Sequence, residues 1–354
     1  MASLLLRKAV EQIRSLWKTN VVRSYLTAIF GALVIGAILL GFAGVNPVTA
    51  YPMIWTGAFG SVRAVTETLV KTIPLLIISS GLTIAFKCNL WNIGAEGQLY
   101  LGAIFATWIG ISVFTGGLLY VPIMIIAGFL AGGLWAAVSG ILKAKLKANE
   151  VLVTMMLNSV AFLLMDYVLL GPLQDPEAQG FPISPFIVNS AYLPKLWSTT
   201  RLHAGIILAI SAPILMYLVL LRTNIGYKIR AVGVNPKAAR YGGIDVAKSM
   251  MIAMFLSGGF AGVAGAIEVC GVHHRLLKGI SPGYGYTGII VALLGKMHPI
   301  GIALASFLFA ALEIGTDAMA RSLNLPIFFS AVLQGVIVLF FIASEFILKK
   351  TKGK

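Results

Sequence analysis

Charged residues and cysteines are both scarce in this sequence. Only 11% of its 354 residues are charged, whereas soluble proteins average about 25%. No polar stretch reaches the roughly 50 residues at which domains begin, which excludes a separate soluble domain. The two cysteines, Cys88 and Cys270, lie far apart in the chain, so no disulfide is expected to support the fold. With 58% hydrophobic residues, the composition is that of a polytopic membrane protein.

The sequence also lacks the motifs of common enzymes. It has no G-x-x-x-x-G-K-[ST] loop for ATP, no G-x-S-x-G nucleophile elbow and no H-E-x-x-H zinc motif. Cys270, His273 and His274 lack a fourth ligand, and we expect them in an outer-surface loop. Residues 283–288 match G-x-G-x-x-G, but no strand precedes them, so we expect their glycines to interrupt a membrane helix. These absences favour transport over catalysis and predict no catalytic residue, no metal site and no cofactor.

Apolar runs suggest a series of membrane spans, each of which needs about 20 residues. They cover residues 25–44, 65–86, 99–114, 120–142, 151–170, 204–221, 250–271, 286–294, 300–315 and 327–347. The predicted fold class is therefore all-α, a polytopic helical membrane protein with about ten transmembrane helices. Residues 279–315 form either two full spans or a re-entrant hairpin. We divide the chain into a cytoplasmic amphipathic N-terminal segment (1–24), a single transmembrane domain (25–347) and a cytoplasmic basic tail (348–354).

The distribution of basic residues predicts the orientation of these spans. With both termini inside, 20 of the 27 Lys and Arg residues fall on the cytoplasmic side and 7 fall outside. The net charge of +15 then reflects loops and tails that face anionic lipid, and no nucleic-acid partner is predicted. The longest outer loop, residues 171–203, faces incoming solute.

The most basic loop, residues 222–249, contains a short predicted helix at 236–241. Asn235 is a good N-cap, Pro236 suits the first helical position and Gly242 suits the C-terminal stop. A helix of about two turns is too short to be stable alone, so its flanking spans or a partner must hold it. An ordinary basic cytoplasmic loop is the alternative interpretation.

Polar residues between or inside the spans are the candidates for a translocation path. The segment 92–98 interrupts two apolar runs and carries Asn92, Glu96 and Gln98. Irregular backbone at membrane depth is tolerated only where it is buried in protein or lines a water-filled cavity, which favours a cavity-lining role over a plain loop. Intramembrane polar groups otherwise form part of a pathway or are buried as pairs. The further candidates are Asn158, Glu268 and Tyr284.

Four segments, in this order, resemble one family of transporters. They are GLTIAFKCNLWNIGAEGQLYLGA (81–103), NEVLVTMMLNSVA (149–161), RAVGVNPKAARYGGI (230–244) and SPGYGYTGIIVALLGKMHPIGI (281–302). The set resembles permeases of bacterial ABC importers of the branched-chain amino acid/ribose class, and within that class it is most similar to permeases for nucleosides and simple sugars. Trp91 and the pair His298-Pro299 depart from the usual pattern without changing this assignment.

The resemblance implies a type II-like ABC importer permease architecture with broken central helices. It also implies three kinds of partner: a second permease subunit (identical or paralogous), cytoplasmic ABC ATPase subunits and an extracytoplasmic substrate-binding protein. The short helix would be the coupling helix that docks on the ATPase. Its exposed side chains Lys237, Arg240 and Tyr241 would face the partner, and Ala239 is expected inside that contact. Its residues are Asn235, Pro236, Lys237, Ala238, Ala239, Arg240, Tyr241 and Gly242.

The predicted function is that of a permease subunit of an ABC importer in the bacterial cytoplasmic (inner) membrane. It translocates a nucleoside, while a separate subunit hydrolyses ATP. A simple-sugar permease is the first alternative. An ion-coupled secondary transporter is the second, with the intramembrane acids as its coupling groups. A membrane enzyme is disfavoured by the missing catalytic motifs. The exact substrate does not follow from this chain, because a separate binding protein helps to select it.

Overall fold

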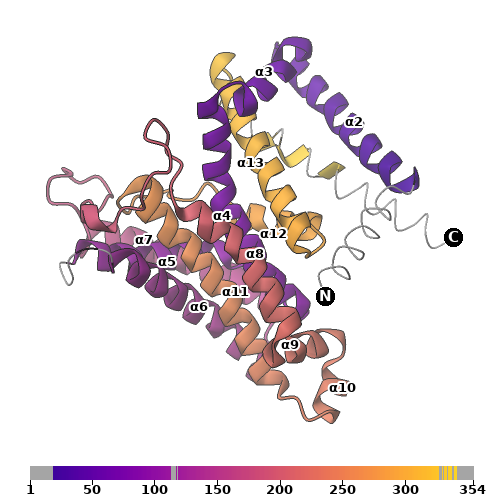
Figure 1. Cartoon of the computed structure of the whole chain (residues 1–354), viewed down its shortest axis with the longest axis vertical. Coiled ribbons are helices and arrows are strands. Elements are labelled where there is room, and N and C mark those ends of the chain that lie inside the picture. Colours follow the sequence, from indigo (N-terminus) through magenta and orange to yellow (C-terminus); the bar gives the residue numbers. More distant parts are fainter. Residues whose placement is uncertain are drawn as a thin grey trace. The chain divides into compact units, whose positions relative to one another are not determined.

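The structure, a computed structural model, describes residues 19–112, 117 and 119–326, together with part of 329–340. Residues 1–18, most of the last predicted span (327–347) and the tail lie outside the described residues. The described helices, labelled in Figure 1, are α2 (Thr19–Phe42), α3 (Pro47–Phe59), α4 (Val62–Lys87), α5 (Ala95–Ile111), α6 (Tyr120–Leu146), α7 (Glu150–Leu170), the 3-10 turn η1 (Asn189–Ala191), α8 (Gly205–Arg222), α9 (Asn224–Val234), α10 (Pro236–Tyr241), α11 (Val246–Glu268), the π-helix η2 (Val269–His273), α12 (Tyr284–Leu294) and α13 (Pro299–Ser322). Apart from two isolated β-bridges, the regular structure in this part of the chain is helical, which confirms the all-α class.

Six described helices are long and apolar enough to cross a membrane: α4, α6, α7, α8, α11 with η2, and α13. A seventh span results if α2 and α3, which are bent by 114°, count as one broken span. Helix α5 has 17 residues and α12 has 11, fewer than the ~20 that a bilayer requires. The predicted count of about ten is therefore not confirmed. The segment 279–315 contains one short helix, α12, followed by the start of one full span, α13.

Helices α3 and α9 were not predicted from hydropathy, because each is shorter than a span. Both begin with a capping side chain. Asn46 accepts a hydrogen bond from the N–H of Val48, and Thr223 accepts one from the N–H of Gly226. Asn46 is followed by Pro47, the same Asn-Pro pair that predicted the helix at 236–241. At these two sites the cap residues are a better signal of a helix than apolar length.

The chain forms two compact units, and the first consists of residues 1–65 and 311–354. Its described part includes α3 and the C-terminal half of α13. The buried apolar residues at its core are Leu40, Ala50 and Met319. Gly315 allows the two helices to approach closely, because a Cβ at this position would lie 2.4 Å from the carbonyl oxygen of Ile54.

The second unit, residues 66–310, contains the candidate functional residues. Helices α5, α6 and α11 pack side by side in it (Figure 1). Two small-residue motifs meet where α6 and α11 cross. A Cβ at Gly262 would lie 2.0 Å from the carbonyl oxygen of Gly128, and a Cβ at Gly132 would lie 2.4 Å from that of Gly258. Only glycine permits so close an approach of two backbones, which is a common way to pack membrane helices.

Helix α4 is more enclosed than the other spans. Of the residues in its apolar stretch, 83% are buried, compared with 22% for α7. Its sequence contains several Ser and Thr residues. Their hydroxyls donate to carbonyls one turn earlier, as Ser79 does to Leu75 at 2.6 Å and Thr83 does to Ser79 at 2.9 Å. These polar groups are thereby satisfied without water, so the helix can lie inside the unit.

The π-helix η2 continues α11 and keeps Cys270 inside the protein. Cys270 is 0% exposed, and its Sγ lies 3.8 Å from the Sδ of Met124. The expectation of an outer-surface loop is therefore wrong for Cys270, because the helix extends one wider turn before the chain leaves it. His273 and His274 are partly exposed. Within the described residues, no three His, Cys, Asp or Glu side chains are grouped to hold a metal ion.

Candidate coupling helix and buried polar cluster

Helices α9 and α10 form a corner between α8 and α11, at the end of the second unit opposite the loop 171–203 (Figure 1). The side chain of Asn235 accepts hydrogen bonds from the N–H groups of Lys237 and Ala238 at 3.0 and 3.1 Å. At the other end, the N–H of Gly242 donates to the carbonyl of Ala238 at 3.0 Å. The predicted bounds of α10 are confirmed. These caps satisfy backbone groups that so short a helix would otherwise leave unpaired.

One face of α10 packs on its own chain and the other is open. Ala239 is 6% exposed, whereas Tyr241 is 95% exposed. The expectation that Ala239 lies in a partner contact is therefore wrong, because its methyl group is part of this chain's own core. Lys237, Arg240 and Tyr241 instead line a shallow groove beside Val246. These three side chains are what α10 offers to a partner.

Helix α9 joins α10 to the break between α4 and α5. A Cβ at Gly233 would lie 2.0 Å from the carbonyl oxygen of Lys87, at the end of α4. A Cβ at Gly226 would lie equally close, 2.0 Å, to the carbonyl oxygen of Val219 on α8. On the other side of α10, Asp245 caps the first turn of α11. Close backbone contacts thus connect the corner to α4 and α8, and the side chain of Asp245 connects it to α11.

Asn92 and Gln98 lie at the centre of a buried polar cluster at that break, and they are 0% and 1% exposed. The Nδ2 of Asn92 donates to the Oε1 of Gln98, and the Nε2 of Gln98 donates to the Oδ1 of Asn92, both at 2.9 Å. Asn92 also donates to the Oγ of Ser257 on α11 at 3.0 Å, and it accepts from the N–H of Gly94 at 3.0 Å. The start of α5 is thereby tied to α11.

Asn158 on α7 ties the same break to α12. Its Oδ1 accepts from the N–H of Gly97 at 2.8 Å, and its Nδ2 donates to the carbonyl of Ile93 at 2.9 Å and to the hydroxyl of Tyr286 at 3.1 Å. One turn earlier, the Oγ1 of Thr154 accepts from the N–H of Ile93 at 3.3 Å. Removing one partner from such a buried network leaves the others unsatisfied, at about 1–3 kcal/mol per group.

Glu96 binds the N-terminus of α12. Its carboxylate accepts from the N–H of Gly285 at 2.7 Å, while the hydroxyl of Ser281 accepts from the N–H groups of Gly283 and Tyr284 at 3.2 and 3.0 Å. A carboxylate in this position complements the positive end of the helix dipole. Gly285 has to be glycine here, because a Cβ would lie 2.2 Å from the backbone nitrogen of Glu96. Glu96 therefore holds α12 directly against α5.

The glycines of residues 283–288 only partly behave as predicted. Gly283, with φ +104°, is the N-cap of α12 and does interrupt the helical path. Gly285 and Gly288 lie inside α12 instead. Gly288 faces α4, where a Cβ would lie 2.8 Å from Cγ2 of Ile78. These two glycines serve close packing rather than a break.

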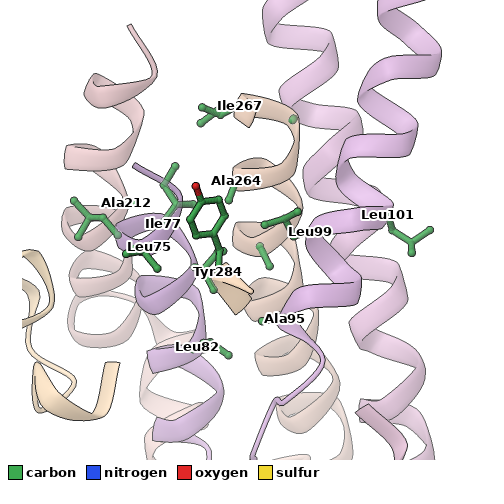
Figure 2. Packing of buried hydrophobic residues seen from close by; sticks show 14 of the residues in the cluster. Leu75, Ile77, Leu82, Ala95, Leu99, Leu101, Ala212, Ala264, Ile267 and Tyr284 are labelled. Carbon is green, nitrogen blue, oxygen red and sulfur yellow. The ribbon is translucent and has the colours of Figure 1, made fainter. Parts of the chain in front are cut away.

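Tyr284 lies in the apolar core of the second unit (Figure 2) and is 4% exposed. The buried side chains drawn around it include Leu75, Ile77 and Leu82 of α4, Ala95 and Leu99 of α5, Ala212 of α8, and Ala264 and Ile267 of α11. The ammonium of Lys71 lies 5.1 Å from the centre of its ring. Glu268, at the end of α11, is 3% exposed, and its Oε2 lies 3.6 Å from the Nε2 of His273.

The structure thus brings Asn92, Gln98, Glu96 and Asn158 together, with Tyr284 beside the Glu96 contact, and it places Glu268 elsewhere. In this conformation, the side chains of Asn92, Gln98, Glu96 and Asn158 form hydrogen bonds with neighbouring protein groups. A groove of about 840 Å³ between α5, α6 and α7 has an apolar lining and contains none of them. Sequence reasoning missed Ser257 and Thr154, since a single hydroxyl in an apolar run carries no distinguishing local signal.

His203, just before α8, predicts a pH dependence of stability. It is 1% exposed, its Nδ1 accepts from the N–H of Gly205 at 3.2 Å, and burial together with the nearby His274 lowers its pKa from 6.5 to about 4. The unfolded chain therefore takes up this proton first as the pH falls. Stability is complete above about pH 6.5 and declines toward pH 4, by up to ~3 kcal/mol. Melting curves of the purified protein between pH 7.5 and 4.5 should show this decline. In His203→Gln, the melting temperature should depend less on pH in this range. If the melting temperatures of the variant and the wild type fall in parallel, His203 is not the group responsible.

The cap of α10 predicts a moderate effect. Asn235→Ala removes the acceptor for two N–H groups, at about 1 kcal/mol, so an interaction that needs a folded α10 should weaken about fivefold. The measurement is the amount of ATPase subunit that co-purifies with the permease. Asn46→Ala removes the same cap from α3 and serves as the matched control, with no loss expected. Equal yields for both variants would show that the α10 cap is not needed for this interaction.

The described helices are those of a multi-pass membrane protein. The chain belongs to the family of permease components of branched-chain amino acid transport systems, whose model matches residues 64–342. It is 34% identical to the guanosine ABC transporter permease protein NupP of Bacillus subtilis, over 93% of this chain and 95% of that protein. It is 31% identical to the nucleoside ABC transporter permease protein NupB of Lactococcus lactis, over 94% and 93%. It is also 33% identical to the glucose ABC transporter permease protein TsgB13 of Haloferax volcanii, over 90% and 86%.

The family assignment identifies the chain as a permease subunit of an ABC transporter and not as an enzyme, so ATP hydrolysis belongs to a partner subunit. An ATPase and a substrate-binding protein are the partners that this family implies. The ion-coupled secondary transporter is therefore not retained as an alternative.

Proposed function

We propose that this chain forms part of an importer that carries a nucleoside across the bacterial cytoplasmic (inner) membrane, with both termini inside. The substrate class is supported by two relatives named for guanosine and nucleoside transport, each of which aligns with more than 90% of this chain. A simple sugar is the second candidate, because a permease named for glucose is 33% identical. The orientation is supported by the excess of Lys and Arg on the side of α10.

One observation carries the proposed coupling. A fully capped two-turn helix, α10, exposes a tyrosine at 95% on the side predicted to be cytoplasmic. Tyr241 lines a groove together with Lys237 and Arg240, and Tyr and Arg are typical anchors of interfaces. We therefore assign α10 as the contact with the ATPase. A second permease subunit completes the membrane part.

The proposed relay runs from α10 to the polar cluster. Movement of α10 acts through α9 on the end of α4 and through Asp245 on α11. Both helices meet at Asn92, whose amide bonds to Gln98 and Ser257. From there Glu96 and Asn158 reach α12. We propose that these residues border the translocation path when the cluster rearranges, with Tyr284 on the same path. Glu268 borders its outer part.

The substrate is tested on the binding protein of the same transporter. Its melting temperature is recorded with single nucleosides and with glucose, ribose and galactose. A nucleoside at about 100 times its Kd stabilises the protein by ~2.7 kcal/mol, which is a clear thermal shift. A shift with a nucleoside and none with sugars supports the proposal. A shift with a sugar alone identifies the second candidate.

A further inference from the structure

The outer loop 171–203 ends in a hairpin with an apolar tip. In residues 194–203, the N–H of Leu196 donates to the carbonyl of Leu202 at 2.9 Å, and Lys195 and His203 form an antiparallel β-bridge. At the tip, Leu196 and Trp197 are 53% and 54% exposed. The hairpin thus holds two large apolar side chains in water in a defined conformation.

The base of this hairpin is fixed to the rest of the second unit. The imidazole of His203 fills the space left by Gly271, where a Cβ would lie 2.4 Å from the ring. Arg201 forms a two-pronged ion pair with Glu67 of α4, with Nε donating to Oε1 at 2.9 Å. A segment anchored in this way loses little conformational freedom when its tip binds a partner, so binding costs little entropy.

The position of the anchors argues against a lipid contact for the tip. Tryptophans that anchor membrane proteins lie at the lipid-facing perimeter. Glu67, however, belongs to α4, of whose apolar stretch 83% is buried, and Gly271 belongs to the span made of α11 and η2, of which 61% is buried. The hairpin is therefore fixed to the two most enclosed of the described spans and not to α7, which is 22% buried.

The exposed chemistry of the hairpin suits a protein partner. Exposed apolar side chains with a polar rim mark interaction sites, and tryptophan is the most typical anchor residue. The rim carries the basic residue Lys195, exposed beside the tip, whereas Arg201 at the base is paired with Glu67. We propose that the hairpin 194–203 is the docking element for the substrate-binding protein, and that it inserts Trp197 into an apolar socket with an acidic rim. This inference rests on the proposed function.

The same hairpin connects docking to the polar cluster. Glu67, which holds Arg201, lies one turn before Lys71 on α4. The ammonium of Lys71 lies over the ring of Tyr284, the first residue of α12, and Glu96 accepts from the N–H of Gly285 at that helix start. Docking on Trp197 therefore reaches α12 through two contacts, Arg201 with Glu67 and Lys71 with Tyr284, while α10 reaches it from the opposite side.

The test is a titration of the complete transporter in nanodiscs with its own binding protein, in the presence of a mixture of four nucleosides. ATP hydrolysis is recorded against binding-protein concentration. Trp197→Ala should raise the half-saturating concentration at least tenfold, with basal hydrolysis and the maximal rate unchanged. Lys195→Glu should raise it as well, and high salt should reduce the difference between this variant and the wild type. Trp108→Ala is the matched control, since Trp108 is an exposed tryptophan (58%) on α5, and no shift is expected from it.

Each outcome separates the docking proposal from the proposed function. A Trp197→Ala titration that overlays the wild type overturns the docking site while the function stands. An effect on basal hydrolysis or on yield from the membrane, equal with and without binding protein, assigns Trp197 to the lipid interface and also overturns it. If the wild type itself shows no stimulation by the binding protein or the nucleosides, it is the proposed function that fails.

Discussion

Tyr241→Ala is expected to uncouple the permease from its ATPase while leaving the permease folded. Tyr241 is 95% exposed, so its removal deletes almost no contact within this chain. If α10 inserts it into the ATPase, the loss is that of an interface anchor, at least ~2 kcal/mol or about 30-fold in affinity. The measurements are co-purification of the ATPase and substrate-stimulated ATP hydrolysis, and both should drop by that factor.

The matched control is Tyr167→Ala. Tyr167 is 70% exposed near the C-terminal end of α7, so it tests the loss of an exposed tyrosine away from α10. It should co-purify like the wild type. Ala239→Asp provides a second comparison, since it places a carboxylate against this chain's own core and should lower the melting temperature of the isolated permease. Wild-type coupling in Tyr241→Ala would remove α10 from the mechanism.

Local features of the fold could be predicted where the signal is local. The bounds of α10 follow from Asn235, Pro236 and the glycine after the helix, because capping depends on adjacent residues. The exposed side chains Lys237, Arg240 and Tyr241 were predicted correctly, but the inward position of Ala239 was not. Six residues carry no clear apolar stripe, so only the position of α9 and α11 decides that Ala239 is covered and Tyr241 is not.

For the polar cluster, the sequence indicated the residues but not their hydrogen-bond partners. Isolated polar residues in apolar surroundings pointed to Asn92, Gln98 and Asn158 as path residues. The structure buries all three side chains, and their place on a path stays a prediction. Their partners could not be predicted, since Asn158 bonds to Tyr286, 128 residues away, and Asn92 bonds to Ser257, 165 residues away. Such pairings depend on the packing of whole helices and not on any short segment.

Glu96→Ala is expected to abolish most uptake by releasing α12 from α5. In the wild type, the carboxylate accepts from the N–H of Gly285 at 2.7 Å, at a site that is 2% exposed. Alanine leaves this donor without a partner where water does not replace the carboxylate, at about 1–3 kcal/mol, and removes the negative group from the start of α12. The remaining bonds from Asn92 and Asn158 keep α5 in place, so the complex should still assemble.

Glu96→Gln shows whether transport needs the hydrogen bond that Glu96 accepts from α12 or the negative charge of its carboxylate. Glutamine keeps one acceptor oxygen for Gly285 and nearly the same volume, so it should retain more uptake than alanine if Glu96 acts by holding α12.

Glu150→Ala is the matched control. Glu150 also lies in the first turn of its helix, but it pairs with the partly exposed Lys143 at 2.7 Å, where ion pairs contribute at most about 1 kcal/mol. Uptake by vesicles should therefore fall at least tenfold in Glu96→Ala, fall less in Glu96→Gln and change less than twofold in Glu150→Ala. If Glu96→Gln is as inactive as Glu96→Ala while the complex still assembles, the negative charge itself is required. If Glu96→Ala transports like the wild type, the contact between α5 and α12 has no part in transport.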